Sequence, residues 1–575
     1  MGSKAVSESV STAPIARGGA LQLRDLPAWV PFALIAVFGL FAYGLSLNSD
    51  FYMDDHPFVL EQETVQGGEW APHGRGFRHV PFLLWRGIYG VAGASAPAFH
   101  ALNFAVHLAT ASALFAFGLA LFRKYELAEI PSRRAALVGA LIFVVHPLAS
   151  EAVNYVRCAE ILLVTLFTLL SAWCLLRLWE KPSLRFGAGL VACAIMAIFS
   201  KDPGIFHLAT TLGLIAWAFW ERGMIRDAVA KAWNRSKPIT LGTAFVLLLS
   251  GAVFAKQWIH IALYKFARTD SEYIWEHTLT QGRVFWAYLA RMIAPLDLHS
   301  DHLLAWSTSA SDLPALLGLC GVIALLIATA FAIRNPRTRL IGLLFALLLA
   351  PLALRFLYPN RELFVEYRAY PALPFFGLLA GLALSSIYER APAAGKWAGL
   401  GLLIALAGLS LQRTSVWGSA EWLAEDVIER YPLNNRARTQ LQGHAYLSGD
   451  YQRVFELATE IRENYVALGA ANARMSGSRE YDPGRATRNL ANCEQLCAYA
   501  LAEVADSRKA LEFTDTVISK FKNELGPFES EKEFEMVAGA LLKVREELAE
   551  NGEAYDRLRR EKRDGFATTG SGEPE

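Results

Sequence analysis

Apolar runs of membrane-spanning length recur over the first 411 residues of this 575-residue chain and constrain its fold more than any other feature. Hydrophobic residues make up 54% of the chain. In lipid the backbone must satisfy its own hydrogen bonds, so runs of this length favour helices. We therefore predict an all-α, polytopic membrane protein with about eleven transmembrane helices, at 29–47, 98–122, 135–149, 156–178, 186–200, 204–220, 238–259, 313–333, 339–357, 371–388 and 397–411.

The distribution of Lys and Arg predicts how the chain crosses the bilayer. Basic residues gather in the short loops around 123–134, 177–185, 222–237 and 334–339, and such loops face the cytoplasm. With an odd number of spans, the N-terminus is then cytoplasmic, whereas the 48–97 loop and everything after Leu411 are extracytoplasmic. The net charge is +1, and no basic tract or Cys/His finger spacing is present, so nucleic acid is not an expected partner.

After residue 411 the composition becomes charged and helix-favouring. Two amphipathic helices with a turn at Gly449 are predicted within 435–461, with a spacing similar to a tetratricopeptide repeat (TPR), which stacks into a binding solenoid. Further helices are predicted near 486–504, 507–520 and 531–549, and a plain helical bundle is the alternative. Domain limits are expected at 21–411 for the membrane part and 412–563 for an extracytoplasmic TPR-like part, with disordered ends at 1–20 and 564–575.

Two adjacent carboxylates, Asp54 and Asp55, follow the first apolar segment. Charge close to hydrocarbon is costly unless it is partnered or solvated, so the pair suggests chemistry. Either acid could serve as a general base, with a slight preference for Asp54. The alternative is a helix N-cap that accepts backbone N–H bonds.

Seven motifs on the predicted outer side, read in order, resemble a known family. They are MDDHPF (53–58), FRHVPF (77–82), Gly93 with Pro97, FHALNFAVH (99–107), VHPLASEAVNY (145–155), SKDPGI (200–205) and EYRAYPALP (366–374). Their order and spacing resemble the GT-C class of membrane glycosyltransferases, and within it the transmembrane and TPR O-mannosyltransferases and their bacterial relatives.

The resemblance implies an activity. Such enzymes move a monosaccharide from a polyprenyl-phosphate donor to a Ser or Thr hydroxyl of a protein, here on the outer face of a bacterial inner membrane. Two departures stand out: Cys158 occupies the position where the family usually has Arg before the acid matching Glu160, with Arg157 one step earlier, and Asp202 replaces a common Glu.

The leaving polyprenyl phosphate needs fixed positive charge rather than a general acid. Lys201, Arg368 and, less firmly, Arg78 are the predicted phosphate ligands; snorkelling to the interface is the alternative for each. Glu366 is expected to hold Arg368, and Glu151 to pair with Lys201 or Arg157.

No cofactor is required by this mechanism, although a divalent cation could bind His56 with the two acids, or the run Asp297, His299, Asp301 and His302. His100 and His146, together with His107, are expected to be supporting core histidines that bond Asn103 or backbone groups.

Three alternatives remain at this point: sugar transfer to a lipid or envelope glycan, a non-catalytic scaffold, and a transporter. A transporter would place ionisable groups near mid-membrane rather than at one rim. Because every candidate catalytic residue precedes Leu411, the C-terminal helices are expected to recruit an acceptor or partner protein.

Overall fold

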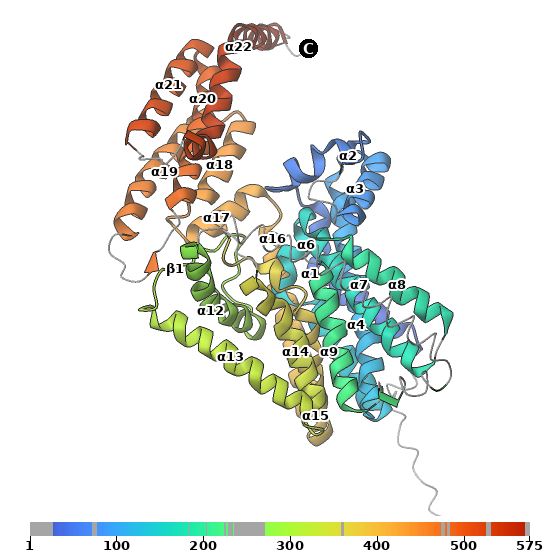
Figure 1. Ribbon diagram of the computed structural model, residues 1–575. Coiled ribbons are helices and arrows are strands. Elements are labelled where there is room, and N and C mark those ends of the chain that lie inside the picture. The colour runs from blue at the N-terminus through green and yellow to red at the C-terminus, as the bar shows by residue number, and fades with distance from the viewer. Residues whose placement is uncertain are drawn as a thin grey trace, which may run out of the picture.

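The computed structural model describes residues 27–71, 78–181, 183–202, 204–223, 226–227, 234, 271–357, 362–472, 478–479, 483–524 and 531–569. Nearly all of this chain is helical, as predicted, and it forms a membrane part and a C-terminal helical domain above one end of it (Figure 1). Extended pairing within the described residues is limited to two residues on each side, β1 (Trp306–Ser307) with β2 (Ser478–Arg479). The predicted span at 238–259 and the N-terminal segment 1–20 lie outside the described residues.

Six described helices are long and apolar enough to cross a membrane. They are α1 with η1 (Val30–Asn48), α4 (Ala96–Lys124), η4 with α7 (Val156–Glu180), α13 (Leu313–Arg334), α14 with the start of η5 (Arg339–Phe356) and α16 (Pro392–Val416). A seventh crossing is made if one bent pair counts as a span. The chain is therefore a membrane protein by its helices, but the expected count of eleven is too high for the described part.

The bent pair explains one difference from prediction. Helix α5 (Glu129–Val144) is followed by η3 (Pro147–Ala149) and α6 (Ser150–Asn154), and the two halves meet at 55°. Pro147 has no N–H to donate and disfavours helical backbone in the residue before it. His146 caps the new segment, because its Nδ1 accepts from the Leu148 N–H at 3.2 Å. The range predicted as the 135–149 span thus contains a bend after Val144, where the chain turns inside the bundle.

Three more predicted spans form helices that do not pass the same test of length and apolarity. Helix α8 (Leu184–Ile198) has 15 residues, about 22 Å at 1.5 Å per residue, which is shorter than a hydrocarbon core of roughly 30 Å. The other two are α9 (Gly204–Glu221) and α15 (Leu373–Arg390). Charged residues enter the end of α15 at Glu389 and Arg390, so its apolar run is shorter than its helix.

Glycines set the closest helix contact in the bundle, between α5 and α15. A Cβ on Gly139 would lie 2.8 Å from the Gly377 carbonyl oxygen, and one on Gly381 would lie 2.2 Å from that of Ala135. Only small residues allow backbones to approach this closely in a membrane interior. These glycines therefore let α15, near the C-terminal end of the membrane part, pack closely against α5, which lies near the N-terminal end of that part.

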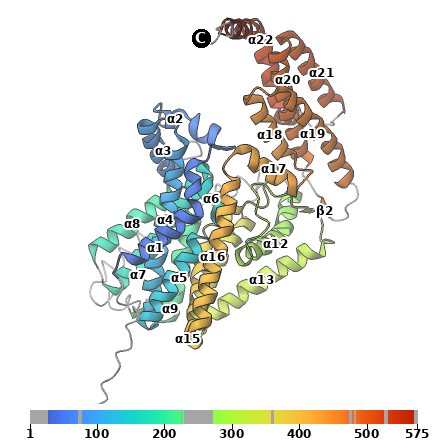
Figure 2. The ribbon, with the colours of Figure 1, turned by 180° about the vertical axis from the view of Figure 1, so that it is seen from behind.

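Several membrane helices expose apolar side chains on their outer faces. Helix α13 has only 17% of its most apolar window buried, with Leu317 and Phe331 more than 60% exposed, and it leaves the bundle at an angle (Figures 1 and 2). Trp397 and Ile404 of α16 are also exposed. An apolar surface of this kind suits a lipid environment rather than water.

The loops at one end of the bundle carry short elements that surround the predicted site. These are η2 (His56–Leu60), α2 (Glu63–Gln66), α3 (His79–Ala92), α12 (Ser271–Ile293), η5 (Leu354–Leu357) and η6 (Glu366–Ala369). Helix α3 buries Phe82 and Trp85 against Phe99, Val156 and Ala159. This packing fixes α3 over the end of the bundle.

The C-terminal domain begins at α17 (Ala420–Arg430), because α16 continues to Val416, a few residues beyond the expected boundary at 412. The predicted hairpin is present as α18 (Asn435–Leu447) and α19 (Tyr451–Asn472), and Gly449 takes the left-handed conformation (φ 79°) in the turn. Then follow α20 (Pro483–Val504), α21 (Ser507–Glu524) and α22 (Glu531–Thr569). The tail expected to be disordered from 564 is helical to Thr569; its remainder lies outside the described residues.

Candidate functional site

Asp54 and Asp55 are adjacent in sequence but occupy different environments. Asp55 is completely buried, and its carboxylate accepts the backbone N–H groups of Tyr52 (3.1 Å) and Arg157 (2.7 Å). It therefore ties the loop before η2 to the start of η4 (Val156–Cys158). Its side chain makes no cap bond to η2, so the helix N-cap interpretation of this pair is wrong for Asp55.

Asp54 presents its carboxylate to the outside of the protein. The preceding Met53 adopts a positive φ of 44°, which is uncommon without glycine, and the Asp54 N–H donates to the Tyr155 hydroxyl at 3.0 Å. Within the described residues, nothing donates a hydrogen bond to the Asp54 carboxylate. Burial of its surroundings raises the pKa of Asp54, against the lowering effect of the nearby Arg157 and Arg436 guanidiniums. An accessible carboxylate with a raised pKa suits a general base.

A buried acid, Glu160, gathers three cations next to this loop. Its Oε1 lies 3.1 Å from Arg78 Nη1 and also contacts Arg157, and its Oε2 lies 3.5 Å from Lys201 Nζ. Arg78 also reaches Asp202 at 3.0 Å. Glu160 and Asp202 together carry two negative charges against the three cations, so the cluster keeps one positive charge that favours anions.

Lys201 and Arg368 both lie beside the ring of Tyr367. Lys201 Nζ is 5.0 Å from the Tyr367 ring centre, and the Arg368 guanidinium carbon is 5.9 Å from it. The side chains of Arg78, Lys201 and Arg368 are 17%, 16% and 8% exposed, each within a network of ion pairs or ring contacts. Such enclosed side chains are not snorkelling to a lipid interface. The three predicted phosphate ligands share one region.

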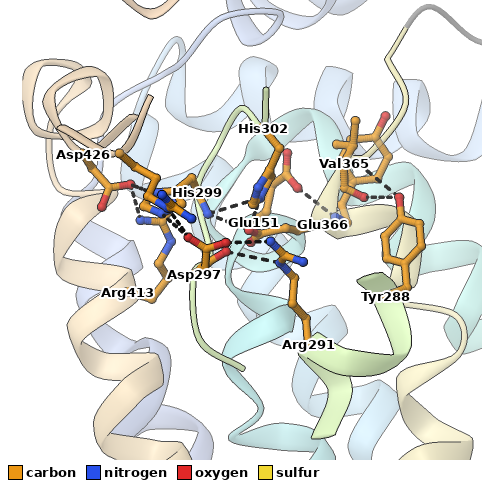
Figure 3. A network of polar contacts seen from close by, with 12 residues as sticks. Glu151, Tyr288, Arg291, Asp297, His299, His302, Val365, Glu366, Arg413 and Asp426 are labelled. Atoms are coloured by element: carbon orange, nitrogen blue, oxygen red, sulfur yellow. Dashed lines mark hydrogen bonds and ion pairs between the residues drawn. The ribbon is translucent and has the colours of Figure 1, made fainter. Parts of the chain in front are cut away.

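The supporting acids have partners other than those expected. Glu366 does not hold Arg368; its Oε1 accepts from the His299 N–H at 2.6 Å and lies 2.8 Å from His302 Nε2. Arg368 pairs instead with Glu362 at 3.1 Å. Figure 3 shows Glu366 in a polar network with both histidines.

Glu151 also differs from prediction, since its Oε2 accepts from the Tyr367 N–H at 2.8 Å, while Lys201 and Arg157 pair with Glu160. Glu151 thereby holds the η6 turn that carries Tyr367 and Arg368. Its burial in α6 behind the bend at Pro147 places it beneath that turn.

The histidines in apolar helices act as core hydrogen-bonding groups. His100 Nε2 bonds the Asp50 carbonyl at 3.0 Å, His146 Nε2 bonds that of Met292 at 2.9 Å, and His107 bonds that of Val144 at 3.1 Å. The expectation of backbone partners is confirmed, but Asn103 bonds the Tyr155 carbonyl instead of His100. His146 thus joins the bend after α5 to the end of α12.

In the described part of the chain, no group of three His, Cys, Asp or Glu residues is placed to hold a metal ion. The run of acids and histidines at 297–302 contacts other groups: Asp297 pairs with Arg291 at 2.8 Å and His299 with Asp426 at 2.9 Å. Asp301 accepts from Asn434 at 3.1 Å. Independence from metal remains a prediction.

Four residues of this site were missed as candidates by sequence reasoning. Arg157 and Glu160 lie inside the region of resemblance, and the i, i+3 spacing of an acid and a base at a helix start was their signal. Glu362 and Arg436 lie outside the motifs and meet only through folding, 3.1 Å apart. No spacing along the chain could have identified that contact.

The chain matches no family model, no curated protein and no solved structure.

Proposed function

We propose that this protein is an integral-membrane glycosyltransferase that moves a monosaccharide from a polyprenyl-phosphate donor to a Ser or Thr hydroxyl of a protein on the extracytoplasmic side. The observation that carries the proposal is the juxtaposition of an accessible carboxylate, Asp54, with the net-positive cluster of Arg78, Arg157 and Lys201 around Glu160. A base and a fixed anion site are the two requirements of this reaction.

In the proposed reaction the acceptor oxygen attacks the anomeric carbon while its proton passes to Asp54. The bond from that carbon to the phosphate oxygen breaks, and the departing polyprenyl phosphate takes the electron pair. Lys201, Arg368 and Arg78 then balance the charge of the phosphate, so no general acid is needed. A single displacement inverts the configuration at the anomeric carbon.

An apolar cleft between α9, α13 and α14 supports a lipid-linked donor. Its lining is dominated by aliphatic and aromatic side chains and ends at Leu354, the first residue of η5. The next residue of η5 is the basic Arg355. A polyprenyl chain held in this cleft would bring its phosphate toward the cationic end of the bundle.

The positive-inside pattern predicts that these loops face the extracytoplasmic side. Transfer to a lipid or envelope glycan is the second candidate for the acceptor, and it requires the same base and phosphate site. A transporter is less well supported, because the charged groups described above gather around the loops at one end of the helices rather than along their middle.

The proposal is tested by comparing Asp54→Asn with Asp50→Asn. Asn keeps the shape of Asp but accepts no proton, so transfer to a Ser/Thr peptide should fall by roughly 10²- to 10⁴-fold in the first variant. Asp50 is an exposed acid four residues earlier, and its variant should retain activity. Mass spectrometry of exported proteins, with and without the gene, identifies the sugar and the acceptor. Full transfer by Asp54→Asn would refute the assignment of the base.

A further inference from the structure

Arg436 belongs to the C-terminal helical domain, yet its guanidinium lies among charged residues of the membrane part. It is the second residue of α18, and its Nη1 lies 3.1 Å from Glu362 Oε1 and 3.6 Å from Asp301 Oδ1. The preceding cap residue Asn434 donates to the other oxygen of Asp301 at 3.1 Å. The N-terminal end of α18 is therefore fixed to two outer loops of the membrane part.

These contacts continue to the proposed phosphate site. Glu362 accepts from Arg436 through Oε1 and from Arg368 through Oε2, at 3.1 Å each. Arg368 in turn lies over one side of the Tyr367 ring, with Lys201 on the same ring. A continuous path of paired side chains thus leads from α18 to Lys201, and Glu362 is its shared carboxylate.

Arg436 also acts on the proposed base. Burial raises the pKa of Asp54; among the charged groups nearby, Arg157 and Arg436 lower it, whereas Glu362 and Glu160 raise it. Asp55 and the Tyr155 hydroxyl complete the titratable groups around this carboxylate. Three of the four charges come from the membrane part, and one comes from the helical domain.

We infer that Arg436 is a positioning residue of the active site, supplied by the helical domain, which holds Glu362 and Arg368 in place and brings its positive charge into the surroundings of Asp54. The helical domain then completes the catalytic site in addition to any role in recruiting an acceptor. This inference rests on the proposed function for its catalytic part, but the contact and its electrostatic effect do not depend on it.

Two measurements on the full-length protein test it. The first is the pH dependence of Asp54 modification by a water-soluble carbodiimide, which reacts with protonated carboxyls, read by mass spectrometry of the labelled peptide. The second is transfer to a short Ser/Thr peptide that is too small to need a docking surface, measured across the same pH range.

Removing one positive charge must raise the pKa of Asp54, so Arg436→Gln should move the labelling midpoint and the acid limb of kcat/KM to higher pH. Glu362→Gln should move both to lower pH, and Arg436→Lys should restore the position of the limb. We expect Arg436→Gln to lower kcat by roughly 10- to 100-fold, the range of one charge-assisted contact.

Arg438→Gln is the matched control, because Arg438 lies on the same helix and pairs with Glu460 at 3.0 Å inside the helical domain. It should leave both midpoints unchanged even if it lowers thermal stability. Equal midpoints in the parent and Arg436→Gln would overturn the inference, whatever the activity. If Arg436→Gln shifts the labelling midpoint but the parent protein transfers no sugar, the contact is upheld and the proposed function is refuted instead.

Discussion

At the scale of single residues, the two neighbouring acids divide their roles according to exposure. Asp55 spends both carboxylate oxygens on backbone N–H groups, whereas Asp54 keeps its oxygens accessible. Acids one residue apart have this difference because the backbone reverses direction at Met53. We therefore propose a chemical role for Asp54, whereas Asp55 holds the loop together.

Burial raises the pKa of Asp55 to about 8, because its effect is larger than the lowering by the backbone N–H groups around the carboxylate. An unfolded Asp loses its proton near pH 3.8, so between that pH and about 8 the folded protein binds one more proton than the unfolded protein. The stabilising contribution is complete below pH 3.8 and is lost as the pH rises toward 8. The Tm of the parent in detergent should thus fall with pH more steeply than that of Asp55→Asn; parallel slopes would contradict this.

The phosphate ligands give a second prediction at this scale. Lys201→Ala and Arg368→Ala should each weaken binding of a polyprenyl phosphate by roughly 10-fold or more, since each removes a charge-assisted contact in a poorly solvated site. Burial lowers the pKa of Lys201 but does not remove its pairing with Glu160. Native mass spectrometry with added lipid measures the loss, and Lys396→Ala, an exposed lysine in the N-terminal part of α16, serves as control. If both variants bind the lipid as well as the parent does, Lys201 and Arg368 do not belong to the phosphate site.

At the scale of elements, Glu160 joins three segments that are distant in sequence. Glu160 lies at the start of α7. Of its cationic partners, Arg78 precedes α3, Arg157 precedes α7 and Lys201 follows α8. Because it has this many partners, the Glu160 carboxylate holds these segments together and also balances part of their positive charge. Its removal takes this counter-charge from the Arg157 guanidinium and the Lys201 ammonium, whereas Arg78 keeps Asp202.

Helix α7 contains its own control for this role. Arg157 with Glu160 and Arg177 with Glu180 are both i, i+3 pairs, but the Glu160 side chain is 2% exposed and that of Glu180 is 26% exposed. Breaking a buried pair costs about 3–5 kcal/mol, whereas an exposed pair contributes about 0–1 kcal/mol. Glu160→Gln should therefore lower Tm clearly and Glu180→Gln hardly at all. A similar Tm for both variants would show that the cluster tolerates loss of its acid.

At the scale of the whole molecule, the helical domain is joined to the membrane part by charged contacts on several sides. Arg413 at the end of α16 pairs with Asp426 of α17 at 2.7 Å, and His299 of the outer loop reaches the same carboxylate (Figure 3). β1 of this loop pairs with β2 of the helical domain. These contacts hold the helical domain against the membrane part, and recruitment of an acceptor by the helical domain remains a prediction.

Asp426 is the residue through which this docking can be tested. Its removal leaves the enclosed Arg413 without its carboxylate, at a cost of up to about 3–5 kcal/mol, reduced by the partial exposure of Asp426. Asp426→Ala should accelerate hydrogen exchange in α17 and in the 297–302 loop, measured by mass spectrometry of the full-length protein. Glu425→Ala, on the exposed side of the same helix, should not. Unchanged exchange at 297–302 would mean that the other contacts suffice.

Apolar run length determined the helical membrane fold, because any segment that spans lipid must close its own backbone hydrogen bonds. Turn chemistry at Gly449 determined the α18–α19 hairpin, since glycine takes the left-handed conformation without a steric penalty. Only the tertiary structure decided which runs were long enough to cross, where Pro147 divides a span, and which partners Glu151, Glu366 and Arg436 choose. Those choices depend on contacts between residues tens to hundreds of positions apart, which periodicity along a chain does not record.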